Sequence, residues 1–244
     1  WLRHSGKRDA VLIATKVGML PGEGGEKLAP TRIIAAAEAS LKRLGTDRID
    51  LYYAHQDDDT VPQEAVLEAF GTLIDAGKVR VLGASNFHAA RLKSAVDLAK
   101  ASDLPRYHVL QPEYNLVSRH KFEGELQDYC VTENIGVLPY YGLASGFLTG
   151  KYRTKDDLSQ SVRGGRMGEL LEGKGAAVLA AMDQVADETG ATHAQIALAW
   201  LMAQEGVTAP IASATSVKQL EDLLPAMELD LSKDQLERLT DAGA

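Results

Sequence analysis

Residues 49–86 read IDLYYAHQDDDTVPQEAVLEAFGTLIDAGKVRVLGASN and contain one complete structural repeat. Residues 49–54 form a short, largely apolar run that is typical of a buried strand. Residues 65–76 carry apolar side chains at helical spacing and are followed by Gly77, a residue that often ends helices. A second apolar run occupies 79–84. This order predicts two parallel strands joined by a helix.

The same alternation continues over the whole chain. The predicted strands are 11–15, 49–54, 79–84, 108–111, 135–139 and 207–213. The predicted helices are 31–44, 65–76, 89–101, 122–133, 176–204 with a break near Gly190, 217–224 and 233–240. Alternating strands and helices predict a parallel sheet covered by helices, either a doubly wound open sheet or a (β/α)8 barrel. No shift in composition marks a boundary, so residues 1–244 are expected to form a single domain.

Polar side chains at the strand ends favour the barrel. They are Lys16, His55, Ser85 with Asn86, Gln111 and Tyr140. A barrel builds its active site from the carboxyl ends of many strands, whereas an open sheet uses one crevice. Neither of the usual glycine-rich phosphate turns, G-x-G-x-x-G or G-x-x-x-x-G-K-[ST], occurs in the sequence.

Composition excludes several classes of function. The chain has 244 residues, a net charge of −8 and 45% hydrophobic residues, as expected of a globular protein without a membrane span. The acidic balance argues against nucleic acid as a partner. One cysteine, Cys130, allows no internal disulfide, and the first residues show no signal-peptide core. We therefore expect a cytoplasmic protein; the sequence does not indicate its oligomeric state.

Two of the polar residues are candidates for catalysis. An ammonium at the position of Lys16 would lower the pKa of a neighbouring acid, although a lysine at a strand end is more often a solvated charge. Strand alternation puts Tyr53 and His55 on the same face, where His55 could polarise a substrate or donate a proton. The alternative is a hydrogen-bonded core histidine. The run Asp57–Asp59 could bind a metal, but such a run ahead of a helix is more often a solvated cluster.

The other strand-end residues match the needs of a planar amide. Ser85, Asn86 and Gln111 offer a hydroxyl and two amides, and Tyr140 offers an aromatic face on which a ring could stack. This combination is what a nicotinamide ring would need.

The sequence resembles the aldo-keto reductases along its whole length. The matching segments are IATKVG (13–18), IDLYYAH (49–55), GKVRVLGASNF (77–87), LQPEYNL (110–116), VLPYYGLASGFLTGKY (137–152) and APIASATSVKQLEDL (209–223). The resemblance implies a (β/α)8 barrel that reduces aldehydes or ketones with NADPH. It also implies that the first two βα units, with an aspartate and a tyrosine of the catalytic tetrad, lie upstream of Trp1.

The resemblance further assigns roles to individual residues. It implies that Lys16 and His55 are catalytic. It implies cofactor contacts for Ser85, Asn86, Gln111, Tyr140, Leu143, Ser213, Thr215, Gln219 and Asp222, and no metal.

The sequence departs from the family pattern in two places. Thr215 stands where family members with a short barrel often have an arginine. NADPH differs from NADH by a 2′-phosphate, and a positively charged side chain such as arginine holds this phosphate best. NADH is therefore a possible second cofactor. Tyr53 lies about 6.5 Å deeper along its strand than His55, a position that favours a core residue over a replacement acid. A non-catalytic NADP-binding or regulatory protein, or an inactive fragment, is the alternative function. The substrate is not indicated, since the polar loop around 163–166 carries no diagnostic chemistry.

Overall fold

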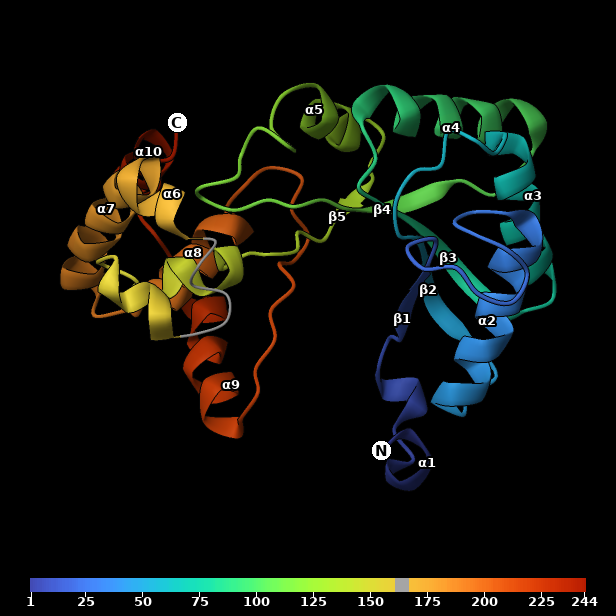
Figure 1. The fold of residues 1–244 in the computed structure, drawn as a ribbon, viewed down its shortest axis with the longest axis horizontal. Coiled ribbons are helices and arrows are strands. Elements are labelled where there is room, and N and C mark those ends of the chain that lie inside the picture. The colour runs from blue at the N-terminus through green and yellow to red at the C-terminus, as the bar shows by residue number, and fades with distance from the viewer. Residues whose placement is uncertain (161–166) are drawn as a thin grey trace. The chain divides into compact units, whose positions relative to one another are not determined.

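The computed structural model describes residues 1–160 and 167–244, so the loop around 163–166 lies outside the described residues. The chain divides into two units (Figure 1). The first unit comprises Trp1–Gln111 and Tyr129–Gly136. The second comprises Pro112–Asp128 and Val137–Ala244.

The first unit contains a parallel sheet with helices packed against one face (Figure 1). Its elements are α1 (Leu2–Ser5), the short 3-10 helix η1 (Arg8–Ala10), β1 (Ala14–Val17), α2 (Pro30–Leu44), β2 (Ile49–Ala54), α3 (Gln63–Asp75), β3 (Val79–Ser85), α4 (Ala89–Ser102) and β4 (Tyr107–Gln111). The strand order in space is the order in the chain, ending with β5 (Gly136–Val137). The predicted alternation of parallel strands and helices is confirmed for this unit.

Side chains of β2 alternate between the helices and the opposite face of the sheet. Tyr52 faces the helices, because its hydroxyl donates to the carbonyl of Ile33 in α2 at 3.2 Å and its ring meets Phe70 of α3 edge-on. Tyr53 points the other way and is 1% exposed. It is level with Lys16 on one side and with Gly83 on the other. The face opposite the helices therefore carries the residues expected to do chemistry.

Strand β1 begins later than predicted. The expected strand was 11–15, whereas β1 spans Ala14–Val17 and Leu12 is exposed. The N–H of Ile13 donates to the side chain of Asp50 at 2.8 Å, and its carbonyl accepts from the N–H groups of Asp50 and Leu51, while the paired residues of the ladder begin at Ala14. Lys16 therefore lies within the strand instead of directly after it.

The carboxylate of Asp50 is a buried anchor at the amino end of β2. Arg8 lies 2.7 Å from one carboxylate oxygen and Arg80 lies 3.0 Å from the other. Burial alone would raise the pKa of Asp50, but the Ile13 N–H and Arg8 outweigh it and lower the pKa. This charge is paired on both of its oxygens, as a buried carboxylate requires.

The second unit is largely helical. Its described elements are η2 (Ala144–Thr149), η3 (Asp156–Gln160), α6 (Gly168–Glu172), α7 (Lys174–Thr189), α8 (His193–Met202), α9 (Val217–Leu223), η5 (Leu224–Glu228) and α10 (Lys233–Ala242), and α5 (Glu125–Thr132) begins in this unit and ends in the first. The predicted break near Gly190 is confirmed: α7 ends there with a φ of 72°.

The predicted strand at 207–213 is wrong as a regular strand. Only a single parallel bridge joins Val207 to Val137, although the N–H groups of Thr208 and Ile211 still donate to Val137 and Pro139 at 2.8 Å. Pro210 has no N–H to donate, so a continuous ladder cannot form across it.

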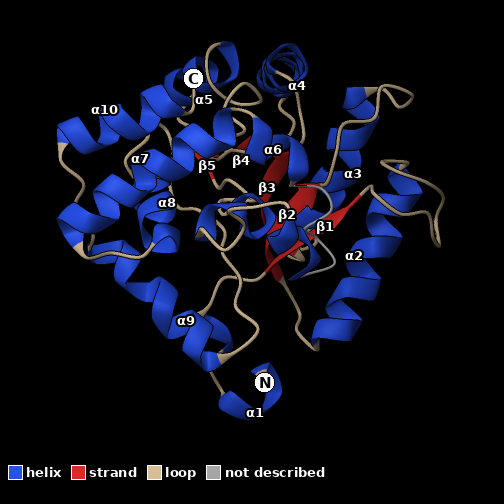
Figure 2. Ribbon diagram, turned by 60° about the vertical axis from the view of Figure 1, so that its left-hand side comes forward, coloured by secondary structure: helices blue, strands red, loops and turns tan. Residues whose placement is uncertain are grey.

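Trp200 of α8 forms the centre of the second unit. Its side chain is fully buried, and its indole N–H donates to the Thr240 hydroxyl of α10 at 3.0 Å. The ring lies 5.5 Å from that of Tyr114, which in turn packs on Phe122. Helices α7, α8 and α10 lie beside one another around this core (Figure 2). Within the described ranges, no helix is both long and apolar enough to cross a membrane.

We predict that Gly83→Ala destabilises the protein by about 1–3 kcal/mol. A methyl group at Gly83 would lie 2.4 Å from two ring carbons of Tyr53, and this buried ring has little room to move. Urea unfolding followed by circular dichroism measures the change.

The matched control for this substitution is Gly71→Ala in α3. Its added methyl would lie 3.5 Å from Pro105, an ordinary contact, and alanine favours a helix over glycine. Equal stability of the two variants would contradict the close packing of Gly83 on Tyr53.

Candidate active site at the carboxyl ends of the first four strands

Lys16 reaches toward the carboxyl edge of the sheet from within β1. Its ammonium donates to the side-chain oxygen of Gln111 at the end of β4 and lies 5.5 Å from the centre of the Tyr53 ring. The side chain is half-buried, and burial lowers the pKa of Lys16. This lysine is therefore a partly desolvated cation with defined partners, unlike a freely solvated surface charge.

His55 directly follows β2 and is held by its backbone on both sides. Its N–H donates to the carbonyl of Val17 at 2.7 Å, and its carbonyl accepts from the side chain of Asn86 at 2.9 Å. Burial and the nearby Lys16 cation lower the pKa of His55. At neutral pH the imidazole is therefore neutral and retains one N–H that can donate to a substrate oxygen.

Ser85, Asn86 and Gln111 come together at the ends of β3 and β4. Ser85 and Gln111 are level with each other, and the Ser85 hydroxyl donates to the Gln111 carbonyl at 2.9 Å. The side chain of Asn86 also donates to the Ser85 hydroxyl at 3.2 Å. Asn86 has a φ of 57°, an unusual backbone conformation for a residue other than glycine that is common at functional sites.

A bulge in β4 puts Gln111 on the face that carries Lys16. Leu82 is level with Tyr107, but Gly83 is level with Val109, so β4 has one extra residue at His108. Tyr107 packs on Phe70 on the helix side. Without the extra residue, strict alternation after Tyr107 would place the side chain of residue 111 on the helix side as well.

Tyr53 lies among these residues but is part of the core. It is almost fully buried, and burial raises its pKa to about 12, while the neighbouring Gln111 acts in the opposite direction. A phenol with this pKa is a weak proton donor at neutral pH. The structure thus agrees with its interpretation as a core residue.

Two candidate cofactor residues lie in the second unit near its start. The N–H of Tyr140 donates to the carbonyl of Pro112 at 2.9 Å, and Glu113 and Tyr140 are bridged in parallel. The Tyr140 ring is half-buried, and burial and Glu113 raise its pKa. The half-buried Leu143 opens a segment in which Ala144 and Ser145 have φ values of 45° and 57°. Strain of this kind is concentrated at binding sites.

The remaining candidates lie on one exposed segment around α9. Ser213, Thr215, Gln219 and Asp222 are predominantly solvent-facing. The N–H and the hydroxyl of Thr215 both donate to the side-chain oxygen of Gln219, at 2.8 and 2.9 Å. The backbone carbonyl of Asp222 accepts from the side-chain amide of Gln195 at 2.7 Å. The segment is ordered by these local contacts and presents polar groups to solvent.

The structure also describes the surroundings of the acidic run and of Cys130. In the part of the chain that the structure describes, no group of three His, Cys, Asp or Glu side chains is arranged to hold a metal ion. Cys130 is fully buried, and burial raises its pKa to about 12, so it lacks the thiolate character of a reactive cysteine.

The sequence gives no sign of Arg91, which binds Asp57 through two hydrogen bonds just beyond His55. The two residues are 34 positions apart, so no local spacing signals the contact. The sequence shows that Asp57 and Arg91 have opposite charges. Only the packing of α4 beside the loop after β2 shows that they form a pair.

Comparison with known proteins finds relatives along nearly the whole chain. The chain is 30% identical to L-glyceraldehyde 3-phosphate reductase of Escherichia coli O157:H7, over 95% of the chain and 69% of the relative. It is 32% identical to a probable voltage-gated potassium channel subunit beta of Arabidopsis thaliana, over 91% and 70%. It is 30% identical to an NADP(+)-designated aldo-keto reductase of Schizosaccharomyces pombe, over 99% and 72%. The chain thus spans about two thirds of the length of these relatives.

The sequence model of the aldo/keto reductase family matches residues 1–244. The family consists of nicotinamide-dependent oxidoreductases that act on carbonyl compounds, and its fold is a (β/α)8 barrel. The parallel strands and covering helices of the first unit are consistent with that fold. On this match and these relatives, the chain belongs to the aldo/keto reductase family.

Proposed function

We propose that this protein reduces aldehydes or ketones to alcohols with NADPH. The observation that carries the proposal is the placement of a half-buried lysine and a histidine on neighbouring strands at the carboxyl edge of the sheet: Lys16 donates to Gln111, and the N–H of His55 donates to Val17, the residue after Lys16. Lys16 would stabilise the anion of a neighbouring acid, and the neutral imidazole of His55 would donate to the carbonyl oxygen and orient it.

The residues of the first unit fit a nicotinamide. Ser85, Asn86 and Gln111 offer a hydroxyl and two amides within one hydrogen-bonded group, and Asn86 is exposed and has a left-handed backbone conformation. A carboxamide needs both donors and acceptors, and these side chains supply both. When bound, the cofactor supplies the hydride, and the protein supplies position and electrostatics.

For the second unit we propose further cofactor contacts. Tyr140 offers a half-buried ring on which the nicotinamide could stack. Leu143, three residues later, offers an apolar side chain. Ser213, Thr215, Gln219 and Asp222 would contact the adenosine end. Lys218 is the cation on this segment, so the preference for NADPH over NADH is expected to be modest.

The proton donor in the proposed reaction is a tyrosine outside residues 1–244. Support comes from Tyr53, since its burial and raised pKa make it unsuited to that role. We also propose that residues 1–244 belong to one barrel domain and that the protein is cytoplasmic, in keeping with its single buried cysteine.

A second candidate function is a regulatory subunit that binds NADP without turnover. The resemblance to a protein named as a potassium channel subunit beta favours it. Tight NADPH binding by the full-length protein, with no reduction of any aldehyde in a broad panel, would support this candidate over the reductase.

We predict that Lys16→Met lowers kcat of the full-length protein by about 10² or more. A positioned general acid increases the reaction rate roughly 10²–10⁴-fold, and in the proposed mechanism the charge of Lys16 stabilises the anion of that acid. Initial rates of NADPH oxidation with a model aldehyde measure it. Lys42→Met, which removes an exposed lysine of α2, is the control. Tyr53→Phe should retain most activity, and its complete inactivation would show that Tyr53 is the acid.

We predict that Lys16→Met also raises the pKa of His55. The lysine cation is one of two causes that lower this pKa, and burial, the larger cause, remains. Because the folded protein holds His55 neutral, the unfolded chain binds more protons just below the ordinary pKa of about 6.5. The histidine therefore makes the free energy of unfolding fall as the pH drops through that range, and less steeply so in the variant. Two-dimensional NMR of the imidazole signals across roughly pH 4–8 measures the shift.

We predict that Thr215→Arg increases the preference for NADPH over NADH by about 10- to 100-fold. One charge-assisted hydrogen bond to a phosphate contributes about 1.5–3 kcal/mol. Fluorescence quenching gives both dissociation constants. Thr215→Gln also removes the threonine hydroxyl contact with Gln219 but adds no charge, and it should leave the ratio unchanged. An equal ratio in all three proteins would refute the role of this segment.

A further inference from the structure

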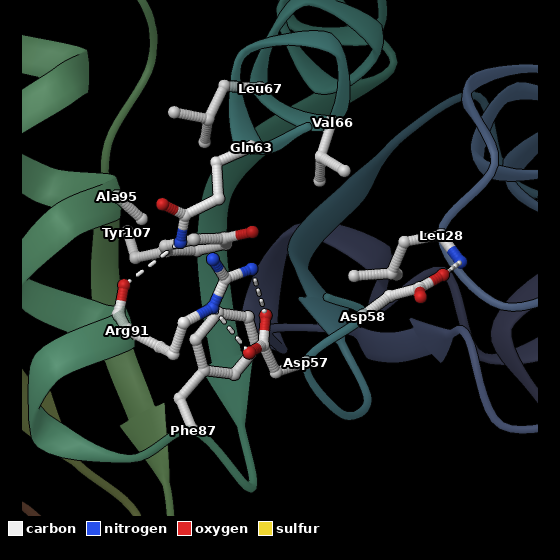
Figure 3. A pocket seen from close by; sticks show the side chains of 10 residues that line it. All are labelled: Leu28, Asp57, Asp58, Gln63, Val66, Leu67, Phe87, Arg91, Ala95 and Tyr107. Atoms are coloured by element: carbon white, nitrogen blue, oxygen red, sulfur yellow. Dashed lines mark hydrogen bonds and ion pairs between the residues drawn. The ribbon is translucent and has the colours of Figure 1, made fainter. Parts of the chain in front are cut away.

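The acidic run after His55 makes specific contacts instead of being solvated throughout. Asp57 accepts two hydrogen bonds from Arg91 in the first turn of α4, from Nε at 2.6 Å and from Nη2 at 3.0 Å (Figure 3). The two side chains are 19% and 33% exposed. A two-pronged, partly buried pair of this kind fixes orientation as well as distance. It therefore ties the loop after β2 to the helix after β3.

The same corner is cross-linked through the start of α3. The side-chain amide of Gln63 donates to the backbone carbonyl of Arg91 at 3.0 Å, and its oxygen accepts from the Ser94 hydroxyl at 2.8 Å. Figure 3 shows the Gln63 side chain pointing at Arg91 from the side opposite Asp57. Arg91 is consequently held by its backbone while its guanidinium holds Asp57.

Asp58 binds the loop that follows β1. Its carboxylate is buried and accepts from the N–H of Leu28 at 3.3 Å. It also accepts from the hydroxyl and N–H of Thr60 at 2.6 and 3.1 Å. The Lys27 ammonium lies 3.7 Å away. Burial raises the pKa of Asp58, but these contacts outweigh it and lower the pKa.

Little free space is left around these contacts. The cavity enclosed by the residues of Figure 3 measures about 10 Å³, no more than one water molecule occupies. The interior side of the Arg91 side chain is therefore closely packed. Loss of the pair is therefore expected to loosen the loop that carries Asp57 and follows His55.

We propose that the Asp57–Arg91 pair is a positioning device for His55, holding the turn after β2 so that the imidazole stays half-buried beside Lys16. The turn is fixed at one end by strand hydrogen bonds to His55 itself. At the other end it is fixed by Asp57 and Asp58, two and three residues later. In this role both aspartates act through the histidine and are positioning residues.

The test is the titration of the His55 imidazole in Asp57→Asn and Arg91→Met, followed by NMR and assigned with His55→Asn. Lys16 of β1 is the charged group whose field His55 senses, together with burial. A loosened turn would expose the ring and move it from Lys16. Both variants should therefore raise the pKa of His55 toward its ordinary value.

The matched control is Asp97→Asn. It removes the exposed ion pair with Lys93 at 2.6 Å on the same helix, α4, without touching the loop. It should leave the His55 titration unchanged. If a variant with a broken pair fails to fold, Arg91→Lys keeps the charge but loses the two-pronged geometry, and should show a smaller shift in the same direction. An unshifted titration in any folded variant of the pair overturns the proposal.

The turnover arm of the experiment rests on the proposed function, and the NMR arm does not. In the full-length enzyme, Asp57→Asn should lower kcat about tenfold or more, since small misplacements of catalytic groups have large effects, while the dissociation constant of NADPH stays within about twofold. A combined Asp57→Arg and Arg91→Asp exchange should recover part of the loss. A shifted titration in a protein without reductase activity would leave the positioning role intact and reject only the proposed function.

Discussion

Parallel pairing of β1 to β4 brings the carboxyl ends of four strands to one edge, and the candidate site depends on that pairing. Lys16, His55, Ser85 and Gln111 are distant in sequence, yet each lies within or just beyond a strand of this sheet. The register determines their depth: Lys16 is level with the buried Tyr53, and His55 lies two residues further toward the carboxyl edge. A shift of one residue in any pair would turn these side chains toward the helices.

Partial burial gives this edge its electrostatic character. Lys16 keeps a single charge in a half-buried position because the Gln111 amide oxygen and the Tyr53 ring face it. The same cation, together with burial, keeps His55 neutral. A change in the position of Lys16 therefore alters the pKa of His55.

Buried or partly buried carboxylates stabilise the sheet at both ends, and each of them is bound by a positively charged side chain or by N–H donors. At the amino end, Asp50 binds Arg8 and Arg80 and the N–H of Ile13. At the carboxyl end, Asp57 binds Arg91 and Asp58 binds the loop after β1. Removing one partner of such a pair leaves the other charge partly buried without compensation, which is the costly outcome. The contacts at the carboxyl end hold the loops beside His55.

The sequence alone determined the alternation of strands and helices, the bounds of β2 and the face on which Tyr53 and His55 lie, because apolar periodicity is a local property. It also identified the family. Three features were decided only by tertiary structure: the later start of β1, next to the contact between Ile13 and Asp50; the bulge at His108 that turns Gln111 toward Lys16; and the Asp57–Arg91 pair. Each depends on a contact between residues far apart in the chain, or on strand register, and neither leaves a periodic pattern in the sequence. The predicted strand at 207–213 failed for a different, local reason: Pro210 removes a backbone donor, which the apolar pattern does not count.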